Sequence, residues 1–445
     1  LGTLAKRAMS QEPRSINTAN EAIDYLYELR LFGTKLGLEN PRRLAAYFGN
    51  PQNELKLIHV AGTNGKGSVC AMLESVYRAA GYRVGMFTSP HLIHFGERVQ
   101  VDRRLLPDDR LVAQVNEIRS ALWTFPREHH PTFFEIVVIL ALLHFREQAC
   151  EVVIWETGMG GRLDATNIVT PLLSIITNVA LDHQKWLGDT LGAIAHEKAG
   201  IIKLGVPLVH GVAGDESRRV VSERALELGS PIHEVDQEVV ESTMGGVEVG
   251  LSGKHQITNA SIAMKAVEVL MTDLPVPPMA IDQGLAKVEW AGRLQHIQRK
   301  NQVVLLDGSH NAPSIEALCA YLEEHFSGVR KAFLMGVLED KGVDQWLPQL
   351  VSRAERFYLT PVGSGRTLST SDLKARLKGI KADVKVDCFE GLDGALAAAI
   401  DQSALLVVCG SIYLVGEALG ILTDDRSNKN QSALNDWGGD PVQGR

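Results

Sequence analysis

The stretch LIHVAGTNGKGSV, residues 57–69, combines glycines, a lysine and a hydroxyl in a spacing that could hold the phosphates of a nucleotide. Glycines can adopt positive φ and leave no side chain between backbone and ligand, so successive N–H groups could bind an anion where a helix begins. Lys66 could reach the β- and γ-phosphates, and Ser68 could offer its hydroxyl to Mg²⁺. The spelling departs from the common P-loop, because Gly67 separates the lysine from the hydroxyl and Val60 replaces the first glycine. A plain strand–helix turn is the alternative, but it does not require a lysine and a hydroxyl there, so we favour a nucleotide site.

The elements that must position this loop are short apolar runs alternating with helical patterns. The first series of runs covers 55–60, 83–89, 151–156 and 172–178. The second series covers 302–307, 331–337, 356–362, 384–389 and 405–410. Continuous apolar runs are typical of strands buried on both faces of a parallel sheet, and their alternation with helices predicts doubly wound α/β units. We therefore expect two α/β domains with a hinge near 289–295.

The expected organisation is an N-terminal P-loop ATPase-like domain over residues 1–292 and a C-terminal Rossmann-like α/β domain over 293–424. Residues 425–445 are polar, contain glycines and lack periodicity, which predicts a disordered tail.

The composition is that of an ordinary globular protein, with 45% hydrophobic residues, 22% charged residues and a net charge of −8. This charge disfavours nonspecific binding to nucleic acid or anionic membranes. Five scattered cysteines without a C-x-x-C pair argue against a disulfide framework or a zinc site and favour a reducing cytosol. The longest apolar run, 133–145, is shorter than the roughly 20 residues that span a bilayer. We expect a cytoplasmic monomer that binds small molecules.

The spelling AGTNGKGS resembles the nucleotide loop of the Mur ligase superfamily, and its Asn-Gly-Lys-Gly resembles the folylpolyglutamate synthase/dihydrofolate synthase family within it. Eight further segments resemble that family in the expected order. They are TSPHL (88–92), GERV (96–99), ETGMGGRLDATN (156–167), LDH (181–183), EKAGIIK (197–203), HQITNA (255–260), GR (292–293) and DGSHN (307–311). Together they extend over most of the chain, from near residue 20 to near residue 420.

The resemblance implies an ATP-dependent amide ligase of the bacterial bifunctional type. Such an enzyme joins L-glutamate to dihydropteroate and to the γ-carboxylate of tetrahydrofolate through an acyl phosphate, giving ADP and phosphate. The implied small-molecule partners are therefore ATP, L-glutamate, dihydropteroate and reduced folates.

The resemblance also assigns a nucleotide site. Its residues are Thr63, Asn64, Gly65, Lys66, Gly67, Ser68, Asn259, Arg293 and Asp307. Taken alone, Asn259 would serve equally well as a helix N-cap. Arg293 would reach the ATP phosphates, although its motif reads WAGR rather than the usual PGR, and Asp307 would accept the ribose hydroxyls. Residues from both domains would thus converge on one nucleotide, which implies an active site in the cleft between the two domains. The implied catalytic residues are Lys66, Lys198, Arg293 and His310.

The implied metal ligands are Ser89, Glu156, His183 and Lys198, for two Mg²⁺ ions. Mg²⁺ prefers oxygen ligands and usually takes one carboxylate with phosphate oxygens and water; a helix-capping carboxylate is the weaker interpretation of Glu156. Without the resemblance, the Asp-His sequence ending at His183 would be a hydrogen-bonded loop pair. Lys198 corresponds to a carbamylated lysine, which requires a neutral amine; alone it would be an ordinary surface lysine at a helix end. K⁺ is a further candidate cofactor.

Two segments correspond to the pterin-binding part of the family's site. They contribute Thr132, Phe133, Phe134 and Glu135 from PTFFE, and Leu163, Asp164 and Ala165 from GGRLDATN. Aromatic rings can stack on a flat heterocycle. The alternative is a helix N-terminus with core phenylalanines, and a glycine-rich second segment that only lets the backbone approach closely.

Three alternative functions remain open at this point. The first is a folylpolyglutamate synthase without dihydrofolate synthase activity. The second is a cell-wall Mur ligase, which would need a UDP-binding domain of about 100 residues before the loop, and Gly62 lies too early for one. The third is a P-loop switch protein that hydrolyses ATP, which would need neither Asp307 nor Arg293.

Overall fold

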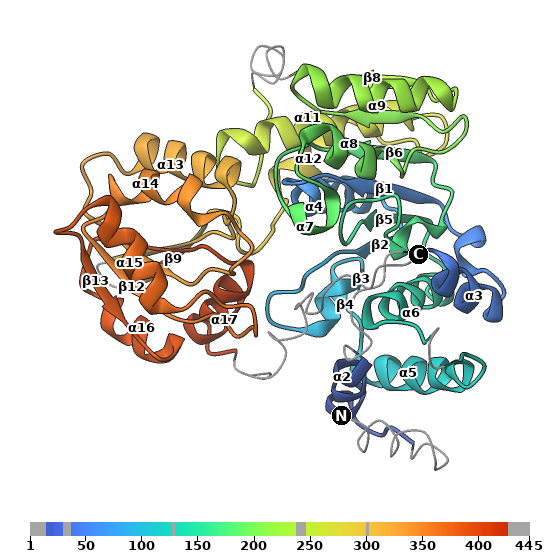
Figure 1. Cartoon of the computed structure of the whole chain (residues 1–445). Helices are drawn as coiled ribbons and strands as arrows, with labels where there is room; N and C mark the ends of the chain where they lie inside the picture. The colour runs from blue at the N-terminus through green and yellow to red at the C-terminus, as the bar shows by residue number, and fades with distance from the viewer. Residues whose placement is uncertain (1–14, 30–36, 127–129, 237–245, 300–301, 426–445) are drawn as a thin grey trace.

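The computed structural model describes residues 15–29, 37–126, 130–236, 246–299 and 302–425. Its strands form two sheets, which lie in two bodies side by side (Figure 1). We call the body around the first sheet the N-terminal unit and the body around the second sheet the C-terminal unit. Within the described residues no helix combines the length and the apolar character needed to cross a bilayer.

The sheet of the N-terminal unit has the strand order β4-β3-β2-β5-β1-β6-β7-β8. Its strands are β1 (Leu57–Ala61), β2 (Val84–Phe87), β3 (Val99–Val101), β4 (Arg104–Leu105), β5 (Val152–Glu156), β6 (Leu173–Ile176), β7 (Leu208–His210) and β8 (Ile232–Glu234). The pairs from β2 to β8 are parallel, whereas β3 and β4 add an antiparallel edge. The central strand β1 lies between β5 and β6, so the loop that follows it emerges at the middle of the sheet.

The sheet of the C-terminal unit has the order β13-β12-β11-β14-β10-β9. Its strands are β9 (Gln295–Arg299), β10 (Gln302–Leu306), β11 (Lys331–Met335), β12 (Arg356–Leu359), β13 (Lys385–Cys388) and β14 (Leu405–Cys409). Only β9, at one edge, runs antiparallel to its neighbour among these described strands.

Helices cover both faces of each sheet. In the N-terminal unit they are α2 (Ala19–Glu28), α3 (Glu39–Tyr47), α4 (Lys66–Ala79), α5 (Asp108–Leu122), α6 (Phe133–Glu147), α7 (Gln184–Leu187), α8 (Leu191–Ala199), α9 (Asp215–Glu227), α11 (Lys254–Val269) and α12 (Pro278–Ala286), with short 3-10 turns at Pro51–Glu54, Phe95–Arg98 and Ala165–Ile168. In the C-terminal unit they are α13 (Ala312–His325), α14 (Leu347–Val351), α15 (Thr370–Ile380), α16 (Leu392–Ala399) and α17 (Ile412–Leu422), with a 3-10 turn at Val343–Gln345.

The burial of β1 on both faces explains its uninterrupted apolar sequence. Leu57 packs into a core with α5 and α6, whereas Ile58 and Val60 pack into a second core with α4, α11 and α12. The C-terminal unit repeats this arrangement, because β10 places Leu305 against α13 to α15 and Leu306 against α16 and α17. These doubly wound layers confirm the predicted α/β class.

Every apolar run expected to be a strand contains one, but the sheets are mixed rather than wholly parallel. The unexpected strands are β3, β4, β7, β8 and β9. They are short or lie at sheet edges, and β9 has an alternating burial pattern that a search for continuous apolar runs does not detect. The run 302–307 is the first of the second series, and Asp307 at its end was expected to follow the first strand of that unit. Because β9 precedes this run, Asp307 follows the second strand. The expected disordered tail lies outside the described residues apart from Asp425.

Candidate active site

The glycine loop connects β1 directly to α4, which begins at Lys66. Gly62 and Gly65 have positive φ values of 157° and 82°, as expected, whereas Gly67 has no positive φ and lies within the first turn of the helix. At Gly65 a Cβ would also lie 2.5 Å from Oδ1 of Asn259, so the left-handed backbone and the close contact both require glycine. The Lys66 ammonium donates to the Gly62 carbonyl at 3.0 Å, which holds it over the loop. The geometry is that of a phosphate-binding turn at a helix N-terminus.

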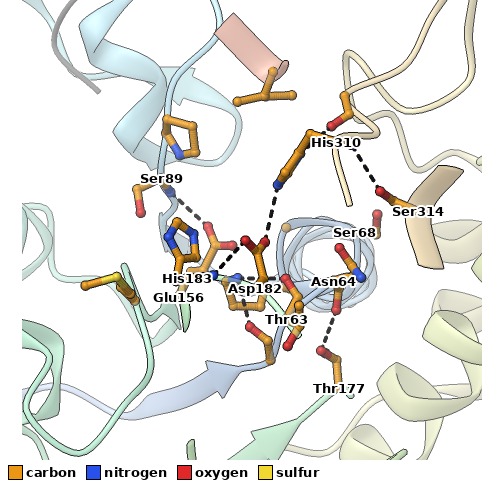
Figure 2. A pocket seen from close by; sticks show the side chains of 18 of the residues that line it. Thr63, Asn64, Ser68, Ser89, Glu156, Thr177, Asp182, His183, His310 and Ser314 are labelled. Carbon is orange, nitrogen blue, oxygen red and sulfur yellow. Dashed lines mark hydrogen bonds and ion pairs between the residues drawn. The ribbon is translucent and has the colours of Figure 1, made fainter. Parts of the chain in front are cut away.

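A second polar layer connects this loop to the C-terminal unit (Figure 2). The side-chain amides of Asn64 and Asn311 hydrogen-bond each other at 3.0 and 3.3 Å. Asn311 also donates to Asp182 at 3.1 Å, and the Lys341 ammonium donates to the same carboxylate at 2.7 Å. Burial opposes ionisation of Asp182, but Lys341 and His310 hold its pKa well below the ordinary value. A buried anion thus lies where the two units meet.

Glu156 ends β5, next to the loop, and is only 4% exposed. Its Oε2 accepts the Ser89 N–H at 2.8 Å, so it does not cap a helix. Burial raises the pKa of Glu156, and the charge of Lys66 partly offsets this effect. A buried carboxylate of this kind favours a bound cation, because a cation restores the solvation that the carboxylate lost.

The donor set fits Mg²⁺ bound together with phosphates. Within the described ranges no three His, Cys, Asp or Glu side chains converge as metal ligands. Mg²⁺ does not require such a cluster, because it commonly takes one or two carboxylates with phosphate oxygens and water. His183 and Glu156 line one cavity, which also contains the glycine loop. Burial lowers the pKa of His183 well below the ordinary value, which favours the neutral imidazole that binds metals. Its backbone N–H donates to Asp182, so the expected loop pair also forms.

Lys198 lies in the last turn of α8 and is 2% exposed, so the interpretation as a surface lysine is wrong. Burial, with a smaller contribution from the charge of Lys66, lowers the pKa of Lys198 to about 7. A substantial fraction of the amine is therefore neutral near neutral pH, which is the form that reacts with CO₂.

The segment PTFFE begins α6, and its polar residues mainly build the helix N-terminus. Thr132 is the N-cap: its Oγ1 accepts the Glu135 N–H, and Glu135 accepts the Thr132 N–H at 2.6 Å. Phe133 belongs to the hydrophobic core, whereas Phe134 is only partly buried and lies against Gly158, where a Cβ would be 2.5 Å from its Cζ. Of this segment, Phe134 has the best placement for stacking on a ligand.

Asp164 holds its own loop together, an outcome that the sequence did not predict. One carboxylate oxygen accepts the Met159 N–H at 2.8 Å, and the other accepts the N–H and hydroxyl of Thr166. Burial raises the pKa of Asp164. Leu163 and Ala165 flank it and line the same cavity.

The C-terminal unit brings Arg293, Asp307 and His310 to this cavity. Asp307 accepts the Leu294 N–H at 2.9 Å and the Ser309 N–H at 3.0 Å, so backbone donors already orient its carboxylate. His310 lies 3.4 Å from Asp182. Asn259 lies inside α11, where its side-chain amide donates to Gln256, so the alternative interpretation as a helix N-cap is wrong.

A single cavity of about 840 Å³ joins all these groups. Every residue expected at the nucleotide, metal and pterin sites lines it, and it is bounded by both units. Their individual roles remain predictions, but the glycine loop, Glu156 and both segments expected to bind the pterin line this one cavity.

Comparison with known proteins shows which family this chain resembles over most of its length. Residues 60–267 match the Mur ligase middle domain, and residues 292–412 match the Mur ligase glutamate ligase domain. The dihydrofolate synthase/folylpolyglutamate synthase of Bacillus subtilis is 34% identical over 79% of this chain and 87% of its own. The chain belongs to the dihydrofolate synthase/folylpolyglutamate synthase family of Mur ligases.

Further relatives support this membership. The dihydrofolate synthase/folylpolyglutamate synthase of Escherichia coli is 31% identical over 94% of this chain and 99% of its own. The structure of E. coli FolC in complex with DHPP and ADP has a TM-score of 0.82 and 29% identity, covering 93% of this chain and 100% of that one. This member of the Mur ligases is therefore an ATP-dependent, amide-forming ligase.

Sequence reasoning missed two features of this ligase site. The first is Lys341: no sequence pattern indicated its ion pair with Asp182, because the two residues lie 159 positions apart in the chain. Arg98 belongs to the GERV motif, but nothing local indicated that it would be 2% exposed, donate to His91 at 2.9 Å and lie 5.4 Å over the Phe133 ring. Burial lowers the pKa of Arg98 to about 10, so it stays charged at neutral pH in the lining of the cavity.

Proposed function

We propose that this ligase joins L-glutamate to dihydropteroate and also to the γ-carboxylate of tetrahydrofolate, using one active site for both reactions. The observation that carries the proposal is the single cavity, which is lined by the glycine loop, by Glu156 and by both segments expected to bind the pterin. Relatives from B. subtilis and E. coli, which align with most of this chain, carry both names. Both acceptors carry a pterin at one end and the reacting carboxylate at the other, joined through a p-aminobenzoyl group, so we expect one cavity to position either of them.

A carboxylate needs activation before an amine can displace one of its oxygens, because oxide is a poor leaving group. Transfer of the γ-phosphoryl group of ATP to the acceptor carboxylate gives an acyl phosphate and ADP. The glutamate amine then attacks the acyl carbon, loses a proton and displaces phosphate, which completes the amide. Lys66 and Arg293 supply positive charge for the phosphoryl transfer, in which catalysis is mostly positioning and electrostatic stabilisation. His310 lies at the same wall of the cavity and can contact a phosphate.

The chain's own groups hold and orient the reactants. Asn259 lies against Gly65, and Asp307 can accept ribose hydroxyls from the C-terminal unit. Ser89 and Glu156 would hold Mg²⁺, which neutralises phosphate charge when bound. On the acceptor side, Phe134 offers an aromatic face for the pterin.

The buried Lys198 supports the further proposal of a carbamate at this position. Its neutral amine attacks CO₂, a C–N bond forms, and one proton is released, leaving an anionic carbamate. That anion would face a second Mg²⁺ ion from the end of α8. Incubation with ¹³CO₂ followed by ¹³C NMR should give a carbamate signal in the wild type and none in Lys198→Met; equal signals would contradict the proposal.

We also propose that the enzyme is a monomer, because one chain supplies every residue expected at the site. We place the domain boundary near residue 292, because the first strand of the C-terminal unit, β9, begins at Gln295. Sedimentation with and without substrates tests the monomeric state, and limited proteolysis tests the domain boundary.

K⁺ is the other cation that we expect as a cofactor. Measurement of the ligase rate with and without K⁺ tests whether the enzyme uses it.

The experiment that tests bifunctionality offers dihydropteroate and tetrahydrofolate separately, each with ATP, Mg²⁺ and L-glutamate, and identifies the products by mass. We expect one amide product from each acceptor, and mutual competition when both are present. Product from tetrahydrofolate alone would reduce the function to folylpolyglutamate synthase. Two products without competition would contradict a shared site.

A further inference from the structure

Trp290 touches the nucleotide loop at Gly67, the residue that separates this loop from the common P-loop spelling. A Cβ added at Gly67 would lie 2.8 Å from the indole Nε1, 3.2 Å from Cε2 and 3.3 Å from Cζ2. The first contact is shorter than real Cβ atoms show, so the indole edge lies directly on the loop backbone. Gly67 is buried and has no positive φ, so its backbone conformation does not require glycine. The proximity of the ring is therefore sufficient to explain the absence of a side chain.

Trp290 also contacts Arg103. The Arg103 guanidinium lies 5.6 Å from the centroid of the indole ring, within the range of a cation–π contact. The same guanidinium donates to the Glu289 carbonyl at 3.1 Å, which fixes the backbone next to the tryptophan. Trp290 is only partly buried and packs against the core beneath α4. The ring thus contacts both the loop and a cation from the turn between β3 and β4.

The segment after Trp290 leads into the other half of the nucleotide site. Gly292 accepts the Gly308 N–H at 3.0 Å, and Leu294 donates to Asp307 at 2.9 Å. Arg293, between them, lines the cavity. Trp290 itself does not line the cavity, so we look for its effect in the loop and in Arg293. Its position connects the start of α4 to the arginine three residues further along the chain.

We propose that Trp290 is a positioning residue that sets the distance between the glycine loop and Arg293, and that Gly67 is glycine because the indole occupies the space of its side chain. The proposal rests on the nucleotide site of the proposed function. In the proposed function both Arg293 and the loop contact the nucleotide phosphates, so a displaced indole should weaken nucleotide binding and turnover together. The acceptor side of the cavity should be unaffected.

A double-mutant cycle tests this contact, with MgADP binding measured by calorimetry in the full-length protein. The variants are Gly67→Ala, Trp290→Ala and the double variant. We expect Gly67→Ala to weaken MgADP binding about tenfold in the wild-type background and about twofold or less in the Trp290→Ala background, because residues in direct contact are energetically coupled. If Gly67→Ala weakens MgADP binding equally in both backgrounds, the proposal is overturned. Gly67 would then be glycine because the phosphate approaches its backbone closely.

Steady-state kinetics distinguish positioning from a general loss of structure. Trp290→Ala should raise the KM for ATP and lower kcat by about tenfold, since small displacements of positioning groups are costly, while the KM for dihydropteroate stays the same. Trp123→Ala, which removes a tryptophan that is 53% exposed, is the matched control and should change neither constant. Unchanged ATP constants in Trp290→Ala would also overturn the proposal.

Two further outcomes are separable. If Trp290→Ala does not fold, as judged by thermal unfolding, Trp290→Phe repeats the cycle with a smaller ring that lacks the contacting indole edge. If the wild type does not bind MgADP, the nucleotide site of the proposed function fails and this inference fails with it. If the wild type binds MgADP but the cycle is additive, only this inference fails.

Discussion

Replacement of the buried Lys198 by methionine should remove a large pH dependence of stability. Lys198 is 2% exposed, and burial lowers its pKa from 10.5 to about 7. In the unfolded chain the amine regains its ordinary pKa. Between these values the unfolded chain carries a proton that the folded chain does not, so the folded state loses stability as the pH falls from 10.5 to about 7. The loss levels off at lower pH, where both states are protonated.

The size of the effect follows from the two pKa values. One pKa unit corresponds to about 1.4 kcal/mol. The free energy of unfolding of the wild type should therefore fall by about 3 to 4 kcal/mol between about pH 10 and about pH 7 because of this one amine. Methionine has a similar length and no titrating group, so Lys198→Met should be the more stable protein at pH 7, and its advantage should nearly vanish at pH 10.

The assay is urea unfolding followed by tryptophan fluorescence across this pH range, in CO₂-free buffer so that the amine stays free. The transition of the N-terminal unit is the relevant one, and Trp155, which is fully buried in β5, reports on it. Lys378→Met is the matched control, because Lys378 also lies in the last turn of a helix but is exposed. If both variants follow the wild-type pH dependence in parallel, the reasoning about the buried amine is refuted.

Three further variants test other contacts. Gly416→Ala would place a Cβ 2.2 Å from the Leu92 carbonyl oxygen; thermal unfolding should show a loss of about 1 to 3 kcal/mol from overpacking, and unchanged stability would contradict that contact. Lys341→Met leaves the Asp182 carboxylate buried without its ammonium partner, so urea unfolding should show a loss of about 3 kcal/mol; a more stable variant would show that the pair does not hold the units together. Phe134→Ala should raise the KM for dihydropteroate about tenfold, as expected for loss of an aromatic contact, and leave the KM for ATP unchanged; the reverse pattern would remove Phe134 from the acceptor side.

The sequence predicted the central strands because their burial on both faces leaves a continuous apolar signal. It missed β9, whose residues alternate between partly buried and exposed, and β7 and β8, which are only three residues long. The glycine loop was predicted from local chemistry, since a strand, a lysine and a hydroxyl lie together in one short stretch. The metal and pterin residues required the family resemblance, because each motif alone had an ordinary structural explanation.

Contacts between distant segments could not be predicted in this way. Asp182 and Lys341 form a buried ion pair only because the two units meet at the cavity. Trp290 was predicted only as part of the hinge near 289–295. Its contact with Gly67 depends on how the connection after α12 packs near the start of α4. Thr132 shows the opposite case, since a helix N-terminus was the ordinary interpretation of its segment, and α6 does begin there at the cavity wall.

The most direct test of the account measures ADP and glutamylated product in the same reaction, with dihydropteroate, L-glutamate, ATP and Mg²⁺, and with each component omitted in turn. We expect one ADP for each amide formed, and no amide when any component is absent. Sustained release of ADP without glutamate, and with no amide product, would contradict the assignment of this cavity to glutamate ligation.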